Sequence, residues 1–410
     1  MSDDVIIIGA GQAGAQTAIV LRQNNFAGAI TMIGDEAYVP YERPPLSKGF
    51  LAGDVELDRM SMRPAAFYAD KNIDVRLKTT VSHIDRGRKT ISLATGEVLP
   101  YGKLVLATGG RVRRMICPGA DLPGIHYLRH VDDVLGFRDR LAPGTKLVIV
   151  GGGYIGLEVA AVAIKRGCTV TVLEMMPLVL NRVVAPVMSQ FYTDVHRAEG
   201  VHIRTSDTVT GFEGDGQLAR VRCGDGTTID ADIAIIGIGI VPNVELAVEA
   251  GLPVDNGIVV DDYTRTSDPD IFAVGDCSNH PLRTIGERVR LESVPNALGQ
   301  GKAAALSIVG APAPYDEVPW FWSDQYDLKL QMTGISKPGD QVIIRGDMAA
   351  RKFSACYLRE GVLVACQAVN MAKDFLQSKK LIAQRIAPPP SLLEDPNTPL
   401  QAFVPATAGS

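Results

Sequence analysis

The sequence is poor in several features that mark large classes of proteins. Its six Cys residues form no Cys-x-x-Cys pair, which excludes a disulfide scaffold and favours reduced thiols in a cytoplasm. No run reaches the roughly 18–20 apolar residues that cross a bilayer, so no membrane association is expected. The net charge of -5 argues against nucleic acid as a partner, because nucleic-acid-binding proteins carry a basic excess. The six His are scattered without metal-ligand spacing, so no metal is expected either.

What the sequence does contain is an internal repeat. Residues 5–14 are a β-branched run that feeds a G-x-G-x-x-G turn, and residues 148–156 repeat this pattern. Each turn is followed by a helix-like stretch and then by an apolar strand that ends in an acid. The acid is Asp35 in the first copy and Glu174 in the second. Farther on, a hairpin and a strand recur in both copies, with 13 residues between their flanking glycines. The repeat predicts two βαβ units of one ancestry, and hence an α/β protein.

This pattern is the fingerprint of dinucleotide binding. The first Gly permits a tight turn, the second lets backbone approach a pyrophosphate, and the third allows close helix–strand packing. The pyrophosphate sits on the helix N-terminus, and the strand-end acid accepts hydrogen bonds from a ribose diol. Two such sites in one chain favour one bound flavin dinucleotide and one exchangeable nicotinamide dinucleotide. The residues expected to form them are Gly9, Gly11, Ala13, Gly14 and Asp35 in the first copy, and Gly151, Gly153, Tyr154, Ile155, Gly156 and Glu174 in the second.

Longer motifs show a resemblance to a known family. These are residues 40–48, 151–158, 238–243 and 320–324, together with Asp276 at the end of a short strand. With them the chain resembles the FAD-dependent pyridine-nucleotide reductases, and within these the ferredoxin reductases of bacterial oxygenase systems. The resemblance implies two Rossmann-like dinucleotide-binding domains of the glutathione-reductase type and a C-terminal α+β domain.

The expected domains follow from this resemblance and from the punctuation of the chain. The FAD-binding domain is expected to be discontinuous, at 1–114 and 245–317, because the first repeat and Asp276 must share one cofactor. The NAD-binding domain is expected at 115–244, and an interface domain at 318–410. In this last domain, alternating patterns predict antiparallel strands, then a helix from about Met371 and an irregular tail.

The resemblance also implies an activity. A flavoprotein reductase of this kind takes a hydride from NADH onto FAD and passes single electrons to a [2Fe-2S] ferredoxin, which supplies a cytochrome P450 or Rieske-type oxygenase. The alternatives are a rubredoxin reductase, an NADH oxidase or an NADH-sensing interaction protein. The redox Cys of disulfide-reducing relatives is missing from residues 43–48, so disulfide reduction is not expected. Cys277 is expected to be a buried small residue.

Individual site residues are carried over from the resemblance. Lys48, Glu158 and Trp322 are expected at the reaction centre, with Lys48 as a charge near the flavin and Trp322 beside its ring. Further cofactor contacts are expected at strand ends and loops: Arg43, Val81, Ala107, Thr108, Gly109, Arg129, Asp276 and Val294 for FAD, and Gly239 for NAD.

Glu158 can be argued from its surroundings. It lies in the apolar stretch Gly-Leu-Glu-Val-Ala-Ala, where an unpaired carboxylate would be costly, so a cationic partner is expected. The resemblance assigns that partner to Lys48. The alternative is a solvent-facing Glu in the first turn of a helix, favoured by the helix dipole.

The choice of nicotinamide cofactor and of acceptor is read from charge. Glu174 would repel the 2′-phosphate of NADPH, and no Arg follows it directly, so NADH is expected, although Arg182 could receive a phosphate. Residues 320–387 hold ten Lys/Arg and six acids, a net +4 on a chain of net -5. We expect an acidic ferredoxin to dock on a face that includes Lys379, Lys380 and Arg385. The alternative is an ordinary solvated surface. The enzyme is expected to be a monomer or a weak homodimer.

Overall fold

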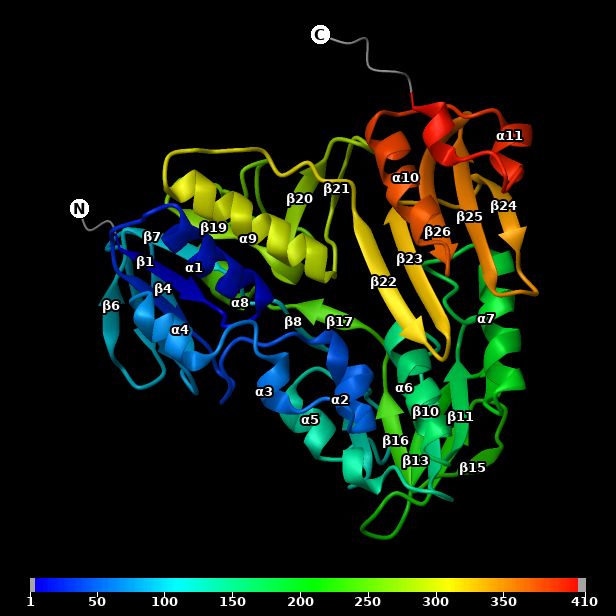
Figure 1. Ribbon diagram of the computed structural model, residues 1–410. Coiled ribbons are helices and arrows are strands. Elements are labelled where there is room, and N and C mark those ends of the chain that lie inside the picture. The colour runs from blue at the N-terminus through cyan, green and yellow to red at the C-terminus, as the bar shows by residue number, and fades with distance from the viewer. Residues whose placement is uncertain (1–3, 405–410) are drawn as a thin grey trace. The chain divides into compact units, whose positions relative to one another are not determined.

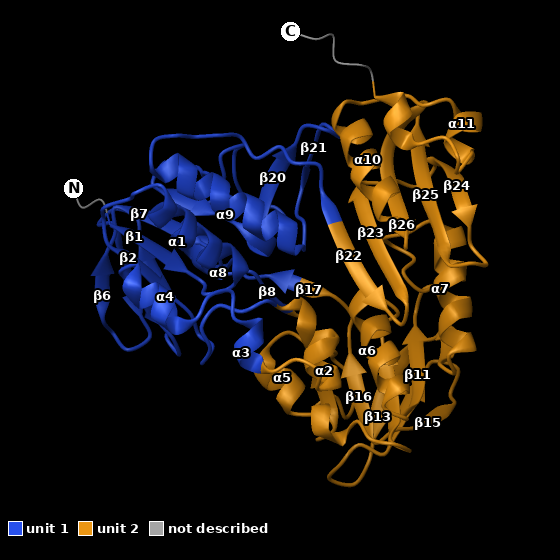
Figure 2. Ribbon diagram, viewed as in Figure 1, with its two compact units in different colours: residues 1–42, 57–111, 241–320 blue, residues 43–56, 112–240, 321–410 orange. Residues whose placement is uncertain are grey.

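The computed structural model describes residues 4–404, and the chain divides into two compact units (Figures 1 and 2). Unit 1 comprises residues 1–42, 57–111 and 241–320, and unit 2 comprises residues 43–56, 112–240 and 321–410. The chain passes between the units near the strands β8 (Gly110–Val112) and β17 (Ile240–Pro242). Within residues 4–404, no helix has the length and apolarity needed to cross a membrane.

Unit 1 is built on a five-stranded parallel sheet. In spatial order its strands are β19 (Ile271–Ala273), β7 (Lys103–Leu106), β1 (Val5–Ile8), β2 (Ile30–Ile33) and β3 (Ile73–Arg76). All four residues of β1 are buried, as expected for a parallel strand that is covered on both faces. Because β19 comes from residues beyond 241, the sheet joins two distant parts of the sequence.

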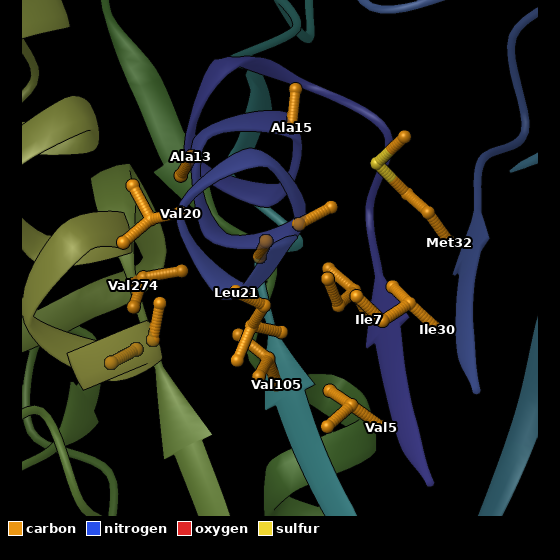
Figure 3. Packing of buried hydrophobic residues seen from close by; sticks show 14 of the residues in the cluster. Val5, Ile7, Ala13, Ala15, Val20, Leu21, Ile30, Met32, Val105 and Val274 are labelled. Carbon is orange, nitrogen blue, oxygen red and sulfur yellow. The ribbon is translucent and has the colours of Figure 1, made fainter. Parts of the chain in front are cut away.

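Alternate residues of β1 enter different hydrophobic clusters, as the period of a strand requires. Val5 and Ile7 pack under the helices α1 (Gln12–Gln23) and α9 (Val294–Ile308), together with Ala15, Leu21 and other small and branched residues (Figure 3). Ile6 and Ile8 face the opposite cluster. The remaining elements of unit 1 are the antiparallel sheet β4 (Val81–Asp85), β5 (Thr90–Leu93) and β6 (Val98–Pro100), the sheet β18 (Ile258–Val259), β20 (Ser278–Leu282) and β21 (Glu287–Val289), the helices α3 (Leu57–Met60), α4 (Ala65–Asp70) and α8 (Glu245–Glu249), and the 3₁₀-helix η3 (Gly275–Cys277).

Unit 2 contains a second five-stranded parallel sheet of the same design. Its strands are β12 (His202–Thr205), β11 (Thr169–Glu174), β10 (Lys146–Val150), β16 (Ile233–Ile236) and β9 (Ile125–Tyr127). As in unit 1, a three-stranded antiparallel sheet precedes the strand beside the central one: β13 (Val209–Glu213), β14 (Arg220–Cys223) and β15 (Thr228–Asp230). The predicted recurrence of a hairpin and a strand is therefore confirmed. The helices of this part are η1 (Pro44–Ser47), α2 (Gly49–Ala52), α5 (Val131–Leu135), η2 (Arg138–Arg140), α6 (Tyr154–Lys165) and α7 (Pro186–Ala198).

The C-terminal part of unit 2 is an antiparallel sheet with helices. Its strands are, in spatial order, β22 (Trp320–Gln325), β23 (Leu328–Gly334), β26 (Val362–Val369), β25 (Lys352–Arg359) and β24 (Gln341–Asp347), followed in sequence by α10 (Ala372–Ala383), α11 (Pro390–Glu394) and η4 (Leu400–Phe403). The tail is more regular than the sequence suggested, because the buried Arg345 side chain donates hydrogen bonds to backbone carbonyls from Leu393 to Thr398. The α/β class with two Rossmann-like sheets and a C-terminal α+β domain is confirmed, while the three domain ranges stay a prediction.

Candidate active site

The first fingerprint turn uses its glycines for two different reasons. A Cβ atom added at Gly9, where φ is +114°, would lie 2.1 Å from the carbonyl oxygen of Ala107. One added at Gly14 would lie 2.0 Å from the carbonyl oxygen of Gly9. Gly11 differs, because within residues 4–404 no atom outside Gly11 and its two chain neighbours lies within 4 Å of its added Cβ, and its φ is -86°. The protein itself does not need Gly11, so the open space fits the backbone approach of a pyrophosphate.

The second fingerprint turn repeats this division. Added Cβ atoms would lie 2.3 Å from the carbonyl oxygen of Gly237 at Gly151, and 2.3 Å from that of Gly151 at Gly156. At Gly153, with φ of -80°, the space is again open among the described residues. Two turns far apart in the sequence therefore leave the same open space at the N-terminus of a helix, at Gly11 and at Gly153. We call each of these spaces a cradle.

The helix N-termini at these turns suit an anion. Gly11 and Gly153 are the N-cap residues of α1 and α6, and neither helix has a side-chain cap or an acid in its first turn. The first N–H groups of each helix are therefore open to an anion, and the helix dipole attracts one. The residues present fit the pyrophosphate of a dinucleotide in both units.

The two strand-end acids lie beside their turns. Asp35 is exposed and follows β2 directly after Gly34, whose added Cβ would lie 2.5 Å from the Cβ of Ala10. Glu174 ends β11, and its carboxylate accepts hydrogen bonds from the backbone N–H groups of Gly152, at 2.7 Å, and Met176, at 2.8 Å. Because a carboxylate has about four acceptor positions, capacity remains for a ribose diol.

Asp276 lies on a turn that packs against the first fingerprint. A Cβ added at the preceding Gly275 would lie 3.1 Å from the Cβ of Ala13. The backbone N–H of Gly275 donates to Oε1 of Gln300 at 2.7 Å, and Gln300 is a fully buried residue of α9. Gln300 could not be predicted from the sequence, because a Gln inside an Ala-rich helix is not specific to any site.

Other predicted FAD residues of unit 1 have clear places. Two hydrogen bonds join Thr108 and Asn243. Oγ1 of Thr108 donates to the Asn243 carbonyl at 2.6 Å, and Nδ2 of Asn243 donates to the Thr108 carbonyl at 2.9 Å. This pair fixes the chain between Ala107 and Gly109, directly beside the Gly9 turn. Val294 opens α9, whereas the side chain of Val81 is buried in the hydrophobic cluster that contains Ile6 and Ile8.

The predicted reaction-centre residues Lys48 and Glu158 meet inside unit 2. Glu158 lies on α6 with 2% of its surface exposed, and its Oε2 lies 2.7 Å from Nζ of Lys48. The expected cationic partner is confirmed, and the solvent-facing alternative is wrong. The guanidinium of Arg43, five residues before Lys48, donates to the carbonyl oxygen of Arg129 at 2.7 Å. Arg43 and Arg129, both predicted to contact the flavin, are therefore also neighbours.

Two serines complete the surroundings of Glu158, and neither was predicted from the sequence. Ser47 Oγ donates to Oε2 at 2.5 Å, and Ser323 Oγ donates to Oε1 at 2.6 Å. A buried carboxylate needs hydrogen bonds at both oxygens, so some donors could have been expected. Their identity could not, since the serines lie 111 and 165 residues from Glu158 in the sequence.

The residues around the second fingerprint include an aromatic group. The ring of Tyr154, the first residue of α6, lies 5.0 Å from that of Phe321, and its hydroxyl contacts Sδ of Met332 at 3.0 Å. Burial raises the pKa of Tyr154 well above its ordinary value. Trp322 is half-buried, Ile155 is exposed, and Gly239 has a φ of +99° in the loop before β17.

The thiols stay outside this chemistry. All six cysteines are unpaired, and residues 43–48 contain none. Cys277 is fully buried beside Asp276, and burial raises the pKa of its thiol, which disfavours the reactive thiolate. Its expected role as a small buried residue is confirmed.

The charges of the C-terminal sheet are partly paired internally. Three of its arginines bond to acids of the same part: Arg345 to Asp374, Arg351 to Asp327 and Arg359 to Asp340. The basic excess therefore falls on other residues. Among the predicted docking residues, Lys380 and Arg385 are exposed, and Lys379 is half-buried on α10.

Comparisons with known proteins show the family of the chain. Residues 3–301 match the model of the pyridine nucleotide-disulphide oxidoreductases, and residues 320–404 match a reductase C-terminal domain. The chain is 45% identical to a 5,5'-dehydrodivanillate O-demethylase ferredoxin reductase subunit of Sphingobium sp., over 98% of each chain. It is 43% identical to putidaredoxin reductase of Pseudomonas putida, over 99% of this chain and 97% of that one. The crystal structure of the covalent putidaredoxin reductase–putidaredoxin complex matches with a TM-score of 0.95 and 43% identity, over 98% of each chain. The expected resemblance is thus confirmed, and the chain belongs to the pyridine nucleotide-disulphide oxidoreductase family.

Proposed function

We propose that this protein is an NADH-dependent flavoprotein reductase that delivers electrons to a [2Fe-2S] ferredoxin of an oxygenase system. The observation that carries the proposal is the pair of matching cradles at Gly11 and Gly153, one in each unit, each open above an uncapped helix N-terminus. One chain with two dinucleotide cradles and no thiol in residues 43–48 supports transfer through a flavin rather than through a disulfide.

The two cofactors are assigned to different units. FAD belongs to the Gly11 cradle, with Asp35 on its ribose and Asp276 beside the start of α1. NADH belongs to the Gly153 cradle, with Glu174 on its ribose. When bound, FAD accepts a hydride from NADH and releases electrons singly, which is chemistry that no side chain supplies. NADH is preferred over NADPH because the fixed Glu174 carboxylate repels a 2′-phosphate.

Lys48, Glu158 and Trp322 are the residues proposed for the reaction centre. Lys48 supplies a positive charge that favours the reduced, anionic flavin. The buried Glu158 carboxylate holds this ammonium group at 2.7 Å, and the Lys48 side chain as a whole is 20% exposed. Trp322 is proposed to lie beside the flavin ring. The domain ranges 1–114 with 245–317, 115–244 and 318–410 are part of the same proposal.

The partner is proposed to be an acidic ferredoxin that docks on a basic face including Lys379, Lys380 and Arg385. The basic excess of residues 320–387 supports this, because positive charge on this part of the chain attracts an acidic partner. The unpaired thiols support a reducing compartment, and a cytoplasmic monomer or weak homodimer is proposed.

Anaerobic stopped-flow mixing tests the function. The FAD-loaded protein is mixed first with NADH and then with an oxidised [2Fe-2S] ferredoxin, while the flavin absorbance is followed. We expect rapid bleaching by NADH and rapid recovery on ferredoxin. Bleaching without recovery on any ferredoxin would contradict the acceptor and favour a rubredoxin, oxygen or a sensing role. Bleaching by NADPH but not by NADH would contradict the cofactor assignment.

A charge variant tests the docking face. Lys379→Gln/Lys380→Gln should raise KM for ferredoxin severalfold and leave ferricyanide reduction by NADH unchanged, because ferricyanide needs no docking surface. The matched control is Lys165→Gln/Lys302→Gln, two exposed lysines outside residues 320–387. Equal KM values for the two double variants would move the docking face elsewhere.

A further inference from the structure

The Glu158 carboxylate is the end of a longer series of hydrogen bonds between side chains that all belong to unit 2. Ser323 Oγ, which donates to Glu158, lies 3.1 Å from Nε2 of Gln325. Oε1 of Gln325 lies 2.8 Å from Nε2 of His196 on α7. The other ring nitrogen of His196 lies 2.9 Å from the hydroxyl of Tyr326. The chain therefore joins β22, α6 and α7 at a single carboxylate.

The direction of every bond in this chain is determined. Ser323 has one proton and gives it to the carboxylate, so it can only accept from Gln325, whose amide N–H₂ must face it. The amide oxygen of Gln325 then faces His196, and since it only accepts, Nε2 of His196 must carry the ring proton. Nδ1 of His196 is left to accept from the hydroxyl of Tyr326. Burial lowers the pKa of His196 to about 4, so the ring is neutral near pH 7.

The alternation of β22 explains why these residues meet. Successive strand residues point to opposite faces, so Phe321, Ser323 and Gln325 share one face, and Trp322 lies on the other. Ser323 and His196 are fully buried, and Gln325 is 2% exposed. Burying polar side chains this deeply costs free energy unless all of them are hydrogen-bonded. Apolar side chains would fill the same space at a lower cost, so this series of hydrogen bonds is expected to have a role.

Two roles are possible for such a chain, transfer of protons or positioning. Transfer requires each member to accept a proton on one side and release one on the other. The amide of Gln325 does not do this at ordinary pH, so the chain is interrupted between Ser323 and His196. Positioning needs only directed bonds between buried groups, and four bonds that all point toward the carboxylate reinforce one another.

We propose that Ser323, Gln325 and His196 are positioning residues that hold the Glu158 carboxylate, and through it the Lys48 ammonium group, in one orientation. The inference rests on the proposed function, in which Lys48 supplies the positive charge at the flavin. Ser323 fixes Oε1, which leaves Oε2 directed at Ser47 and Lys48. Without the chain, Glu158 can rotate and Lys48 loses its defined place.

The test is a double-mutant cycle on the FAD-loaded protein. Gln325→Met keeps the length of the side chain and removes both of its hydrogen bonds. In the parent we expect it to slow flavin reduction by saturating NADH about tenfold, the size of one lost hydrogen bond between neutral groups. We also expect it to lower the midpoint potential of the flavin by about 30 mV, which for a two-electron couple corresponds to a tenfold change in the equilibrium constant of reduction. In a Glu158→Gln background the same change should alter the rate by less than twofold.

A matched control separates positioning from general damage. Gln367 is 3% exposed on β26 and forms hydrogen bonds with the Tyr357 hydroxyl and the Val183 carbonyl, and within residues 4–404 neither bond leads to Glu158. Gln367→Met should lower stability but leave the rate and the potential unchanged. If Gln325→Met does not fold, Ser323→Ala replaces it in the cycle. Its control is Ser354→Ala, since Ser354 is also buried and donates to a buried carboxylate, that of Asp374.

The outcomes separate this inference from the proposed function. Equal slowing by Gln325→Met in both backgrounds would show a merely structural role and overturn the inference. No slowing by Gln325→Met, when Lys48→Ala does slow reduction, would overturn the inference and leave the proposed function standing. If Lys48→Ala changes neither the rate nor the potential, the role of Lys48 in the proposed function fails, and the positioning role fails with it.

Discussion

The helices α1 and α6 begin alike and then diverge. Both follow a turn in which the first and third glycines are required by close backbone contacts and the second is open. Two residues after the third glycine, α1 has Gln16 and α6 has Glu158. Gln16 is half-buried against α9, where an added Cβ at Gly301 would lie 3.2 Å from it. Glu158 is buried and bonded by Lys48 and two serines.

The difference separates the part of a dinucleotide site that only binds the cofactor from the part that is proposed to take part in the reaction. The cradle is made by backbone, and the same three glycines build it twice. The position two residues after the third glycine differs between the units. In α1 it is Gln16, which packs against another helix, and in α6 it is Glu158, which belongs to a charged cluster. We therefore expect substitutions in the turns to act alike in both units and substitutions at the divergent position to act in one unit only.

The largest expected effect is on stability, at the first glycine of each turn. Gly9→Ala and Gly151→Ala should each lower the free energy of unfolding by about 3 kcal/mol, because the new Cβ meets a backbone carbonyl and the φ is positive. Urea unfolding measures this. Gly96→Ala is the control, since its φ of +90° is also unfavourable but its surroundings are open, and it should cost about 1 kcal/mol. Equal losses at Gly9 and Gly96 would contradict the role of close contact.

A pH dependence should appear in both units. Burial lowers the pKa of His196 in unit 2 and of His280 in unit 1 to about 4. Between that value and the ordinary ~6.5 the unfolded chain binds more protons than the folded one, so stability falls as the pH is lowered. Each histidine should account for about 2 kcal/mol lost between pH 7 and pH 5.

Single variants check this assignment by urea unfolding at the two pH values. His196→Gln and His280→Gln should each lose about 2 kcal/mol less than the parent on acidification. His83→Gln, at an exposed position, should behave as the parent does. A parent-like loss in all three variants would assign the pH dependence to other groups.

The divergent position provides the next prediction. Lys48→Ala removes the cation that is bonded to Glu158, and it should slow flavin reduction by NADH at least tenfold or weaken FAD retention. Gln16→Ala, at the equivalent position of α1, should change the reduction rate less than twofold. Stopped-flow absorbance and the FAD content of the purified protein measure both. Parental reduction and full FAD content in Lys48→Ala would remove Lys48 from the reaction centre.

The smallest expected effect concerns the strand-end acids. Glu174→Ala should raise KM for NADH roughly fivefold with little change in kcat, because its half-buried carboxylate contributes to binding rather than to chemistry. Asp35→Ala should instead raise the dissociation constant of FAD and leave KM for NADH unchanged. Steady-state kinetics and FAD titration of the apoprotein distinguish these results. An exchange of the two effects would reverse the cofactor assignment.

The fold and the cradles could be predicted from sequence because their signals are local. The glycine spacing, the apolar strand and the terminal acid lie within about 30 residues in each copy, and each has one physical reason. A cationic partner for Glu158 could also be predicted, because a charged residue in an apolar stretch is rare and costly without one. Ser47, Ser323 and His196 could not be found in this way. Their roles depend on contacts between distant segments, and common polar residues carry no signal of such contacts.

The tail illustrates the same limit. Its prolines suggested irregular structure, but α11 and η4 form because Arg345, about 50 residues earlier, bonds the backbone between them. A long-range bond from a buried arginine leaves no mark on the local sequence of the tail.

The most direct test of two separate cradles is to fill each in turn and measure the FAD content and the flavin absorbance. Gly11→Val and Gly153→Val place side chains into the open spaces, and thermal unfolding checks that both variants fold. We predict that Gly11→Val is purified without FAD, whereas Gly153→Val retains FAD that is bleached by dithionite but not by NADH. Full FAD content in Gly11→Val, or bleaching of Gly153→Val by NADH at the parental rate, would contradict the account.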